Sequence, residues 1–279
     1  MDTKEILNLQ GIKQTLMFPL WGRAVFSRLY PEILYDKEAV DIVNSLEYDF
    51  SEIKKAFGEY GGLCYVIRAR KIDDTIKHFI LEHPNATVVN IGAGLDTTFS
   101  RVDNGTIRWY DIDLSDVIAL RKKLIPKNDR SICIAKSVFD YTWFKDICFD
   151  AKDGILFIAG GVFFFFAEDK IKELLITLAE NFPNGELYFD GQTKMALKIS
   201  NKMVKKTGNK EALMYFYINN PKIFASWSPL LYLKSTEPYF KNIKRDKRWK
   251  ISTKINMIFC DLLKMVSFYH IKFKDKYVA

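Results

Sequence analysis

Thr87–Ile91 (TVVNI) runs directly into Gly92–Asp96 (GAGLD), and this stretch decides the fold. The short β-branched run predicts a buried strand. The glycines Gly92 and Gly94 let the backbone turn sharply and approach a ligand closely. In an open α/β sheet such a turn lies at the carboxyl edge of the strands, where ligands bind. The pattern alone also fits a plain tight turn, so its meaning depends on the residues that follow.

The residue three positions after Gly94 argues against a dinucleotide ligand. A dinucleotide-binding fingerprint requires glycine there, and the chain has Thr97. Without that glycine, the start of the following helix is a poor fit for a pyrophosphate. A zwitterionic ligand without phosphates fits better, and Asp96 offers a carboxylate to its ammonium group.

An acid at the end of the next strand supplies the second half of the pattern. Trp109–Asp113 (WYDID) ends in Asp113, and the period of two along a strand puts Asp111 on the same face but deeper. A carboxylate has two oxygens and can accept hydrogen bonds from both hydroxyls of a ribose. Asp113 is therefore the candidate for binding an adenosine ribose. Capping of the helix that begins near Leu114 is the alternative role.

The rest of the chain alternates strand-like and helix-like segments. After a helical N-terminal region (residues 1–84) with breaks at Pro19, Pro31 and Gly61–Gly62, we expect strands at Thr87–Ile91, Ile107–Ile112, Ile132–Ala135, Ile155–Ala159, Glu186–Asp190 and Val266–Phe273. We expect helices at Thr98–Arg101, Leu114–Leu124, Tyr141–Ile147 and Lys170–Glu180. This alternation predicts an open α/β sheet, mostly parallel and wrapped by helices, behind a helical N-terminal cap.

Composition and charge bound the class of protein. The 279 residues are 48% hydrophobic, 15% aromatic and 27% charged, which excludes a disordered chain, a collagen-like repeat and a small disulfide scaffold. The formal net charge of +8 is uneven: residues 191–279 carry 19 Lys and Arg against 5 Asp and Glu, and residues 1–190 carry 23 against 29. The basic C-terminal third therefore raises the question of an anionic partner.

We expect neither a secretion signal nor a membrane or metal site. The N-terminal residues are polar and acidic, and the longest apolar stretch, Gly154–Ala167, is too short to span a bilayer. Four scattered cysteines and three histidines show no metal-ligand spacing. The expectation is a cytoplasmic protein with free thiols, no bound metal and no membrane partner.

Separated motifs along nearly the whole chain resemble one family. The motifs are Gly11–Leu16 with Arg23, Val66–Asp74 (VIRARKIDD), Val88–Arg101 (VVNIGAGLDTTFSR), Trp109–Asp116, and Ser137–Asp140 with Trp143. In this order they are similar to the leucine carboxyl methyltransferase superfamily, within it to the branch named for the tetracenomycin polyketide O-methyltransferase. The resemblance implies a Rossmann-like class I methyltransferase sheet with an antiparallel last strand. It also implies S-adenosylmethionine as cofactor and S-adenosylhomocysteine as product.

The resemblance also assigns roles to individual residues. It implies that the methionine carboxylate binds Arg68, the methionine and ribose pass over Gly92 and Gly94, the ribose hydroxyls bind Asp113, the adenine lies between Ser137 and Val138, and Arg23 has a looser role in the N-terminal lid. An arginine fork is suited to a carboxylate. The alternative for Arg68 is a surface ion pair with Asp73 or Asp74.

One position departs from the family pattern. After the fourth strand, leucine carboxyl methyltransferases carry a glutamate that faces the cofactor, and here the cofactor-facing position is Gly160. The ammonium group of the cofactor is left with Asp96 and backbone carbonyls as partners, so the protein-phosphatase substrate of that family is not expected to carry over. The following run, Phe163–Phe166, would line an apolar substrate pocket in part, with at least half of its rings in the core.

The expected function is O-methylation of a small-molecule carboxylate or phenolic hydroxyl. A carboxylate acceptor needs no general base, whereas a hydroxyl usually does. No base is evident, since His270 in the last strand is expected to be structural, although Tyr188 and Asp190 end the fifth strand. The acceptor would lie between the cap and an insert around residues 191–235 of the methyltransferase domain (residues 85–279), and the basic residues would favour an anionic one.

Two other functions stay open from the sequence. One is a nucleic-acid methyltransferase that uses the basic segment Lys241–Lys250, although no separate RNA-binding module is seen and we do not expect a nucleic-acid partner. The other is a catalytically silent protein that binds S-adenosylmethionine. The sequence leaves the oligomeric state undetermined.

Overall fold

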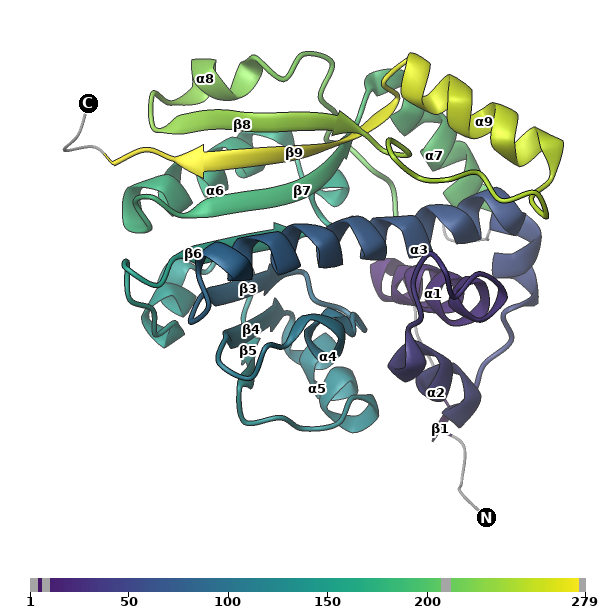
Figure 1. Cartoon of the computed structure of the whole chain (residues 1–279), viewed down its shortest axis with the longest axis horizontal. Coiled ribbons are helices and arrows are strands. Elements are labelled where there is room, and N and C mark those ends of the chain that lie inside the picture. The colour runs from purple at the N-terminus through teal and green to yellow at the C-terminus, as the bar shows by residue number, and fades with distance from the viewer. Residues whose placement is uncertain (1–4, 7–10, 207–211, 276–279) are drawn as a thin grey trace.

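A seven-stranded sheet forms the centre of the molecule (Figure 1). The computed structural model describes residues 5–6, 11–206 and 212–275. From one edge of the sheet to the other, the strands are β5 (Ser131–Ala135), β4 (Arg108–Asp113), β3 (Thr87–Ile91), β6 (Ile155–Ala159), β7 (Glu186–Gln192), β9 (Val266–Phe273) and β8 (Leu231–Pro238). The first five are parallel, whereas β9 runs antiparallel to both of its neighbours. The prediction of a mostly parallel sheet with an antiparallel last strand is confirmed.

The strand order places a binding crevice beside β3. Strands β4 and β5 follow β3 on one side of the sheet, and β6 and β7 follow on the other. The chain therefore changes direction of travel between β3 and β6. In open α/β sheets, ligands bind outside the carboxyl ends of the strands at such a switch point.

The strand predictions hold closely except at one edge. Strands β3, β6 and β9 have the bounds expected from the sequence, β4 and β5 begin one residue away from their expected starts, and β7 extends to Gln192. Strand β8 was not expected, because Leu231–Pro238 (LYLKSTEP) overlaps the segment taken as an insert. As an edge strand it is largely exposed, so it carries no run of apolar residues that would mark it.

Helices cover both faces of the sheet (Figure 1). The long helix α3 (Ser51–Glu82) crosses one face, with α1 (Met17–Leu29) packed against it and α2 (Lys37–Ser45) packed on α1. The remaining helices are α4 (Thr98–Val102), α5 (Ser115–Leu124), α6 (Glu168–Asn181), α7 (Lys194–Lys206), α8 (Ile223–Trp227) and α9 (Ile251–Leu262), with 3-10 turns η1 (Gly11–Leu16), η2 (Tyr141–Asp146) and η3 (Phe163–Phe165). A short parallel pair, β1 (Glu5–Ile6) and β2 (Leu46–Glu47), lies outside the main sheet. Within these described elements, no helix is both long and apolar enough to cross a membrane.

Two of the expected breaks in the N-terminal region are wrong. Pro19 lies in the first turn of α1, where the missing N–H has no helical partner to lose. Gly61 and Gly62 lie inside α3, which continues through them. Glycine is required there because bulky neighbours leave no room for a side chain: a Cβ on Gly62 would lie 1.9 Å from a ring carbon of Phe26. The irregularity in α3 is at Gly58, whose φ of 54° and ψ of −152° are not helical.

The sheet has a buried apolar cluster on each face. Neighbouring residues of one strand point to opposite faces, so Val88 joins the cluster under α1 and α3 while Val89 joins the cluster under α6. Leu156 and Phe157 of β6 divide in the same way. The N-terminal helices therefore share one continuous core with the sheet.

Candidate functional site

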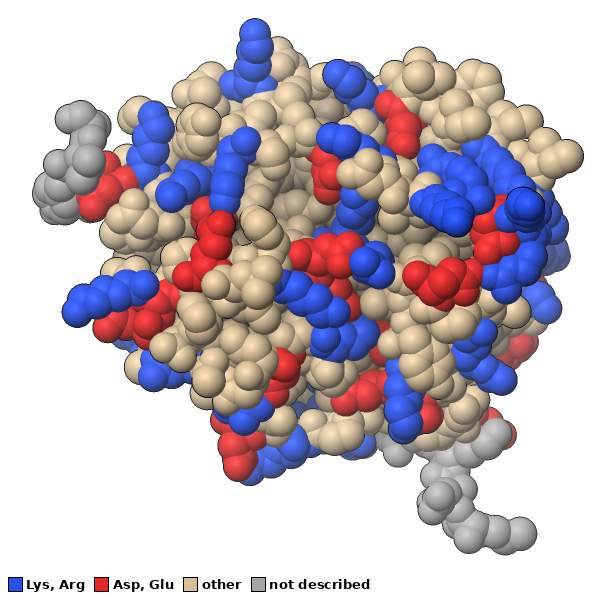
Figure 2. Space-filling view, viewed as in Figure 1, with Lys and Arg blue, Asp and Glu red and all other residues tan. Residues whose placement is uncertain are grey.

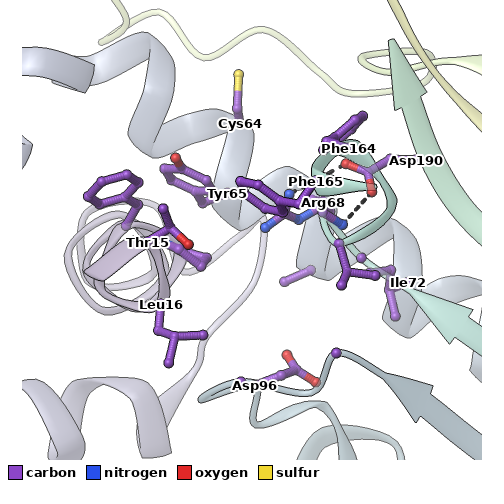
Figure 3. Close-up of a pocket in the computed structure, with 18 of the residues that line it drawn as sticks. Thr15, Leu16, Cys64, Tyr65, Arg68, Ile72, Asp96, Phe164, Phe165 and Asp190 are labelled. Atoms are coloured by element: carbon purple, nitrogen blue, oxygen red, sulfur yellow. Dashed lines mark hydrogen bonds and ion pairs between the residues drawn. The ribbon is translucent and has the colours of Figure 1, made fainter. Parts of the chain in front are cut away.

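One cavity of about 780 Å³ opens at the carboxyl ends of β3, β4 and β6 (Figure 3). Helices α1 and α3 form one side of it, and η3 and α7 contribute to the other. All nine residues proposed from the sequence as cofactor-binding line this cavity: Arg23, Arg68, Gly92, Gly94, Asp96, Asp113, Ser137, Val138 and Gly160. The residues thus come together in space, although their individual roles stay predictions.

The glycine loop at the end of β3 requires its glycines. Gly92 and Gly94 have φ angles of 65° and 50°, in the region that side chains disfavour. A Cβ on Gly92 would also lie 2.3 Å from Cγ2 of Val162. The amide of Gly92 donates a 2.8 Å hydrogen bond to the carbonyl of Ile112, so the loop is tied to β4. The fold therefore brings backbone amides close to the cavity at this turn.

Asp113 braces the glycine loop from the end of β4. Its Oδ2 accepts a 2.8 Å hydrogen bond from the amide of Gly94, and its Oδ1 accepts one of 2.8 Å from the amide of Leu114. Leu114 is the residue that precedes α5, and no side chain caps that helix there, so the capping alternative for Asp113 is wrong. Burial raises the pKa of Asp113, and the two amides oppose that shift. Each carboxylate oxygen keeps a second lone pair for a ligand hydroxyl.

Asp96 carries its charge in a basic environment. It accepts hydrogen bonds from the side chains of Asn90 and Thr98 and from the amide of Thr98. Burial alone would raise its pKa, but the guanidinium groups of Arg23 and its neighbours Arg101 and Arg121 outweigh burial and hold the pKa below its ordinary value. An ionised carboxylate therefore lines the cavity beside the glycine loop (Figure 3).

A buried ionic network joins the cap to the glycine loop. Arg23 donates to Asp36 through Nε (2.9 Å) and to the carbonyl of Leu95 through Nη2 (2.7 Å). Arg101 of α4 donates to Asp36 (2.8 Å) and to Asp73 of α3 (2.7 Å). All four charged side chains are at most 9% exposed. Arg23 therefore affects the cavity mainly by holding the glycine loop in place.

Arg68 and Asp190 meet on the wall opposite Asp96 (Figure 3). The Nη1 of Arg68 lies 3.4 Å from Oδ2 of Asp190, whose Oδ1 accepts a 2.6 Å hydrogen bond from the amide of Gly161. Burial raises the pKa of Asp190, and the Arg68 guanidinium opposes that shift. Asp190 is the site residue that the sequence left unassigned, because only a contact between distant segments marks it.

The expected alternative for Arg68 is wrong. Asp73 pairs with Arg101, and Asp74 pairs with Arg70, so neither acid is bonded to Arg68. Arg68 instead lies over the ring of Tyr65, at 5.5 Å from its centre, and lines the cavity.

Gly161 makes room for the Arg68 side chain, and Gly160 lies against Ile72. A Cβ on Gly161 would lie 2.2 Å from Nη1 of Arg68, and a Cβ on Gly160 would lie 2.8 Å from Cδ1 of Ile72. A glutamate at position 160, as the family pattern has, would require Ile72 to move.

The half of the cavity beyond Arg68 is apolar and aromatic. Phe164 and Phe165 of η3, followed by Phe166, line it together with residues of α3 and α7. Phe163 lies instead in the core, where its ring centre is 5.1 Å from that of Phe189. Three of the four rings therefore reach the cavity, one of which, Phe164, is also buried.

His270 lies outside the cavity. Its Nε2 is 2.6 Å from Oε2 of Glu186, whose Oε1 lies 3.0 Å from the ammonium group of Lys234. This cluster sits on strands β7, β8 and β9, and neither His270 nor Tyr188 is among the residues that line the cavity. Among the residues that the structure describes, no group of three or more His, Cys, Asp or Glu side chains could hold a metal ion.

Comparison with known proteins points to one family. The family model described as leucine carboxyl methyltransferase matches residues 19–179. Over 253 residues, which are 88% of this chain and 91% of the relative, the chain is 28% identical to the tetracenomycin polyketide synthesis O-methyltransferase TcmP of Streptomyces glaucescens.

Solved structures share the fold at low sequence identity. A protein of Thermobifida fusca described provisionally as a methyltransferase has a TM-score of 0.60 at 10% identity and covers 91% of this chain and 94% of its own. The plantazolicin methyltransferase BpumL, solved in complex with S-adenosylhomocysteine, has a TM-score of 0.50 at 12% identity and covers 95% of this chain and 99% of its own. These likenesses show the fold.

Proposed function

Because this chain belongs to the leucine carboxyl methyltransferase family and is an S-adenosylmethionine-dependent methyltransferase, we propose that it methylates an oxygen of a small apolar acceptor, preferentially a carboxylate. The observation that carries the proposal is the division of one cavity into two parts. Charged groups and the glycine loop line the part at the strand ends, and aromatic rings line the part beyond Arg68. The first part suits a nucleoside with a charged amino-acid arm, and the second suits an apolar ring system.

The groups around the glycine loop fit S-adenosylmethionine. Arg68 would bind the methionine carboxylate, Asp96 the ammonium group and Asp113 the ribose hydroxyls, each by charge-assisted hydrogen bonds. The positive φ angles of Gly92 and Gly94 leave the backbone open to the methionine and ribose. A carboxylate with two free lone pairs and an arginine fork are the donors and acceptors that such a ligand requires.

The remaining assignments follow the walls of the same cavity. Ser137 and Val138 would flank the adenine, and the backbone at Gly160 would lie beside the methionine arm. Arg23 would act indirectly, since its Nε donates to Asp36 and its Nη2 to the carbonyl of Leu95.

The chemistry requires little from the protein beyond alignment. The bound cofactor supplies a methyl group on an activated sulfonium. The cap and the aromatic wall orient the acceptor and exclude water. Among the described residues that line the cavity there is no histidine, and burial raises the pKa of Tyr65 and of Cys64, so both stay protonated at neutral pH. The Asp190 carboxylate also lines the cavity, but it is engaged by Arg68 and by the amide of Gly161. A carboxylate acceptor needs no base and is therefore favoured over a phenol.

The nature of the acceptor draws further support from one relative. TcmP is named as a polyketide O-methyltransferase, and this chain covers 91% of it. By analogy the acceptor of this chain is a small organic molecule. The basic segment 241–250 does not line the cavity, so a nucleic-acid substrate has no geometric support.

A product assay tests the proposal. The protein is incubated with S-adenosylmethionine and matched pairs of aromatic carboxylic acids and phenols, and products are identified by mass spectrometry. Methyl esters are expected, together with S-adenosylhomocysteine. Methyl ethers without esters would contradict the preference for carboxylates, and cofactor binding without transfer to any acceptor would favour a catalytically silent protein. A parallel binding assay with RNA and DNA at low salt tests the nucleic-acid alternative.

A further inference from the structure

Helix α9 turns an apolar face away from the protein. Five large side chains on it are between 44% and 76% exposed: Ile251, Ile255, Ile258, Phe259 and Leu262. Their spacing of three and four residues places them along one side of the helix. The other side of α9 is buried and contacts α3 and β9. Soluble proteins rarely expose a contiguous apolar patch of this kind without a partner for it.

The segments next to this face are strongly basic. The loop that leads into α9, residues 241–250, carries six Lys and Arg against one Asp. Lys241, Lys244, Lys247 and Lys250 are exposed, and no acidic side chain in the described part of the chain forms an ion pair with them. Figure 2 shows a group of blue side chains, with some red ones among them, beside the tan surface in the region of α9. The apolar face therefore has a rim of positive charge.

Helix α7 also carries exposed lysines and exposed apolar side chains. Its five lysines are all exposed: Lys194, Lys198, Lys202, Lys205 and Lys206. Met195 and Ile199, 49% and 48% exposed, add apolar surface between them.

The buried side of α9 and one side of α7 contribute to the cavity wall. Cys260 of α9 and Met203 of α7 line it, and so does Ile199, which is about half exposed and therefore lies at the rim.

We propose that α9 binds the surface of an anionic lipid membrane, with its apolar face at the boundary of the acyl chains and the surrounding lysines among the headgroups. Apolar side chains on one face of a surface helix, with Lys and Arg beside them, are the features that bind proteins to such surfaces. A second copy of this chain fits less well, because pairing α9 with α9 would bring two positive rims together. The sequence predicted no membrane partner because no stretch spans a bilayer, but a helix that lies on the surface needs no such stretch.

Vesicle flotation of the full chain tests the proposal. Neutral phosphatidylcholine vesicles are compared with vesicles that also contain phosphatidylglycerol. Binding is expected to the anionic vesicles and to weaken at high salt. The double variant Ile258→Ser/Phe259→Ser should lower the partition coefficient by about ten-fold or more, since two apolar side chains no longer enter the acyl boundary. Lys247→Glu/Lys250→Glu should weaken binding to the anionic vesicles.

Matched controls separate this effect from a general loss of surface character. Leu81→Ser removes a 79% exposed leucine at the far end of α3, and Lys152→Glu/Lys172→Glu reverses two exposed charges away from α9. Both should float like the unchanged protein, and circular dichroism checks that every variant folds.

Three results would overturn the proposal. The first is no flotation with anionic vesicles, and the second is flotation that the α9 double variant leaves unchanged. The third is a dimer, measured by light scattering, that the α9 double variant converts to a monomer, because the face would then be covered by a second copy.

Discussion

The guanidinium of Arg68 and the carboxylate of Asp190 lie 3.4 Å apart, measured from Nη1 to Oδ2, although 122 residues separate them in the chain. Helix α3 carries the arginine and strand β7 carries the acid, so the contact crosses one end of the cavity. Asp190 is fixed in turn by the amide of Gly161. The acid thus fixes one nitrogen of the arginine fork at the cavity wall.

Replacement of Arg68 should weaken cofactor binding. In Arg68→Ala the affinity for S-adenosylhomocysteine is expected to fall about 10- to 100-fold, because a charge-assisted hydrogen bond to a carboxylate is lost. Arg68→Lys keeps the charge without the fork, so its affinity should lie between those of the unchanged protein and Arg68→Ala. Calorimetry measures both. The control is Arg70→Ala, which removes an exposed ion pair with Asp74 and a hydrogen bond to the carbonyl of Ile33. Equal affinities for Arg68→Ala and Arg70→Ala would contradict the assigned role.

Replacement of Asp113 should affect the nucleoside end of the ligand. Asp113→Asn removes one acceptor and the charge, and adenosine binding is expected to weaken about ten-fold while methionine binding is retained. Titrations with adenosine and methionine separately distinguish the two ends. Asp129→Asn, at a 95% exposed side chain, is the matched control. Unchanged adenosine affinity in Asp113→Asn would show that the acid only braces the loop.

A side chain at Gly92 should destabilise the protein for two reasons. The left-handed backbone costs about 1–2 kcal/mol, and the contact with Val162 adds about 1–3 kcal/mol to the loss in unfolding free energy of Gly92→Ala. Gly105 has a φ of 89° but no atom within 4 Å of a Cβ, so Gly105→Ala reports the backbone cost alone. Urea unfolding measures both. Equal losses would mean that the close approach to Val162 is unimportant, and adding Val162→Ala to Gly92→Ala should recover only the steric part.

The Glu186 cluster predicts a loss of stability in acid. Burial alone would raise the pKa of Glu186, but the close contact with His270 and the hydrogen bonds from Lys234 lower it to about 2 from an ordinary value of 4.5. The unfolded chain therefore binds more protons than the folded one between these values. The stabilisation is present above about pH 5 and is lost as the pH falls toward 2.

The exposure of Lys234 limits the size of this loss of stability, and an exposed contact elsewhere provides the control. Because Lys234 is 41% exposed, we expect a contribution of about 2 kcal/mol. Urea unfolding at a series of pH values should show a shallower acid slope for Glu186→Gln. Glu82→Gln, which removes an exposed contact with His78, should leave the slope unchanged. Parallel curves for Glu186→Gln and the unchanged protein would refute the assignment.

Local patterns in the sequence were sufficient for the buried centre of the fold. Strands β3, β6 and β9 carry runs of apolar or alternating residues, which mark a strand whatever its neighbours. Strand β8 has no such run, because an edge strand pairs on one side only and faces solvent. In α3 the sequence pointed to the wrong glycines. Gly61 and Gly62 look like helix breakers, but close packing against aromatic rings explains them, and the kink lies at Gly58.

The parts of the site that lie at the ends of neighbouring strands could be predicted from the sequence. The glycine loop and Asp113 follow from the ends of two adjacent parallel strands, which must meet at the same edge of the sheet. The pairs of Arg68 with Asp190 and of Arg101 with Asp36 join segments 122 and 65 residues apart. Contacts between such distant segments leave no spacing or periodicity in the sequence, so only the folded chain reveals them.

The ionic network under the cap bears on how this chain could have diversified. Arg101 comes from the sheet portion, whereas its partners Asp36 and Asp73 come from the first 84 residues. A foreign N-terminal segment that lacked these two acids would leave the buried guanidinium of Arg101 without an ionic partner, at a cost of about 3–5 kcal/mol. That is a large share of the 5–15 kcal/mol that typically stabilises a domain. The N-terminal segment and the sheet portion are therefore tied energetically, and exchange of one without the other would lower the stability of the whole.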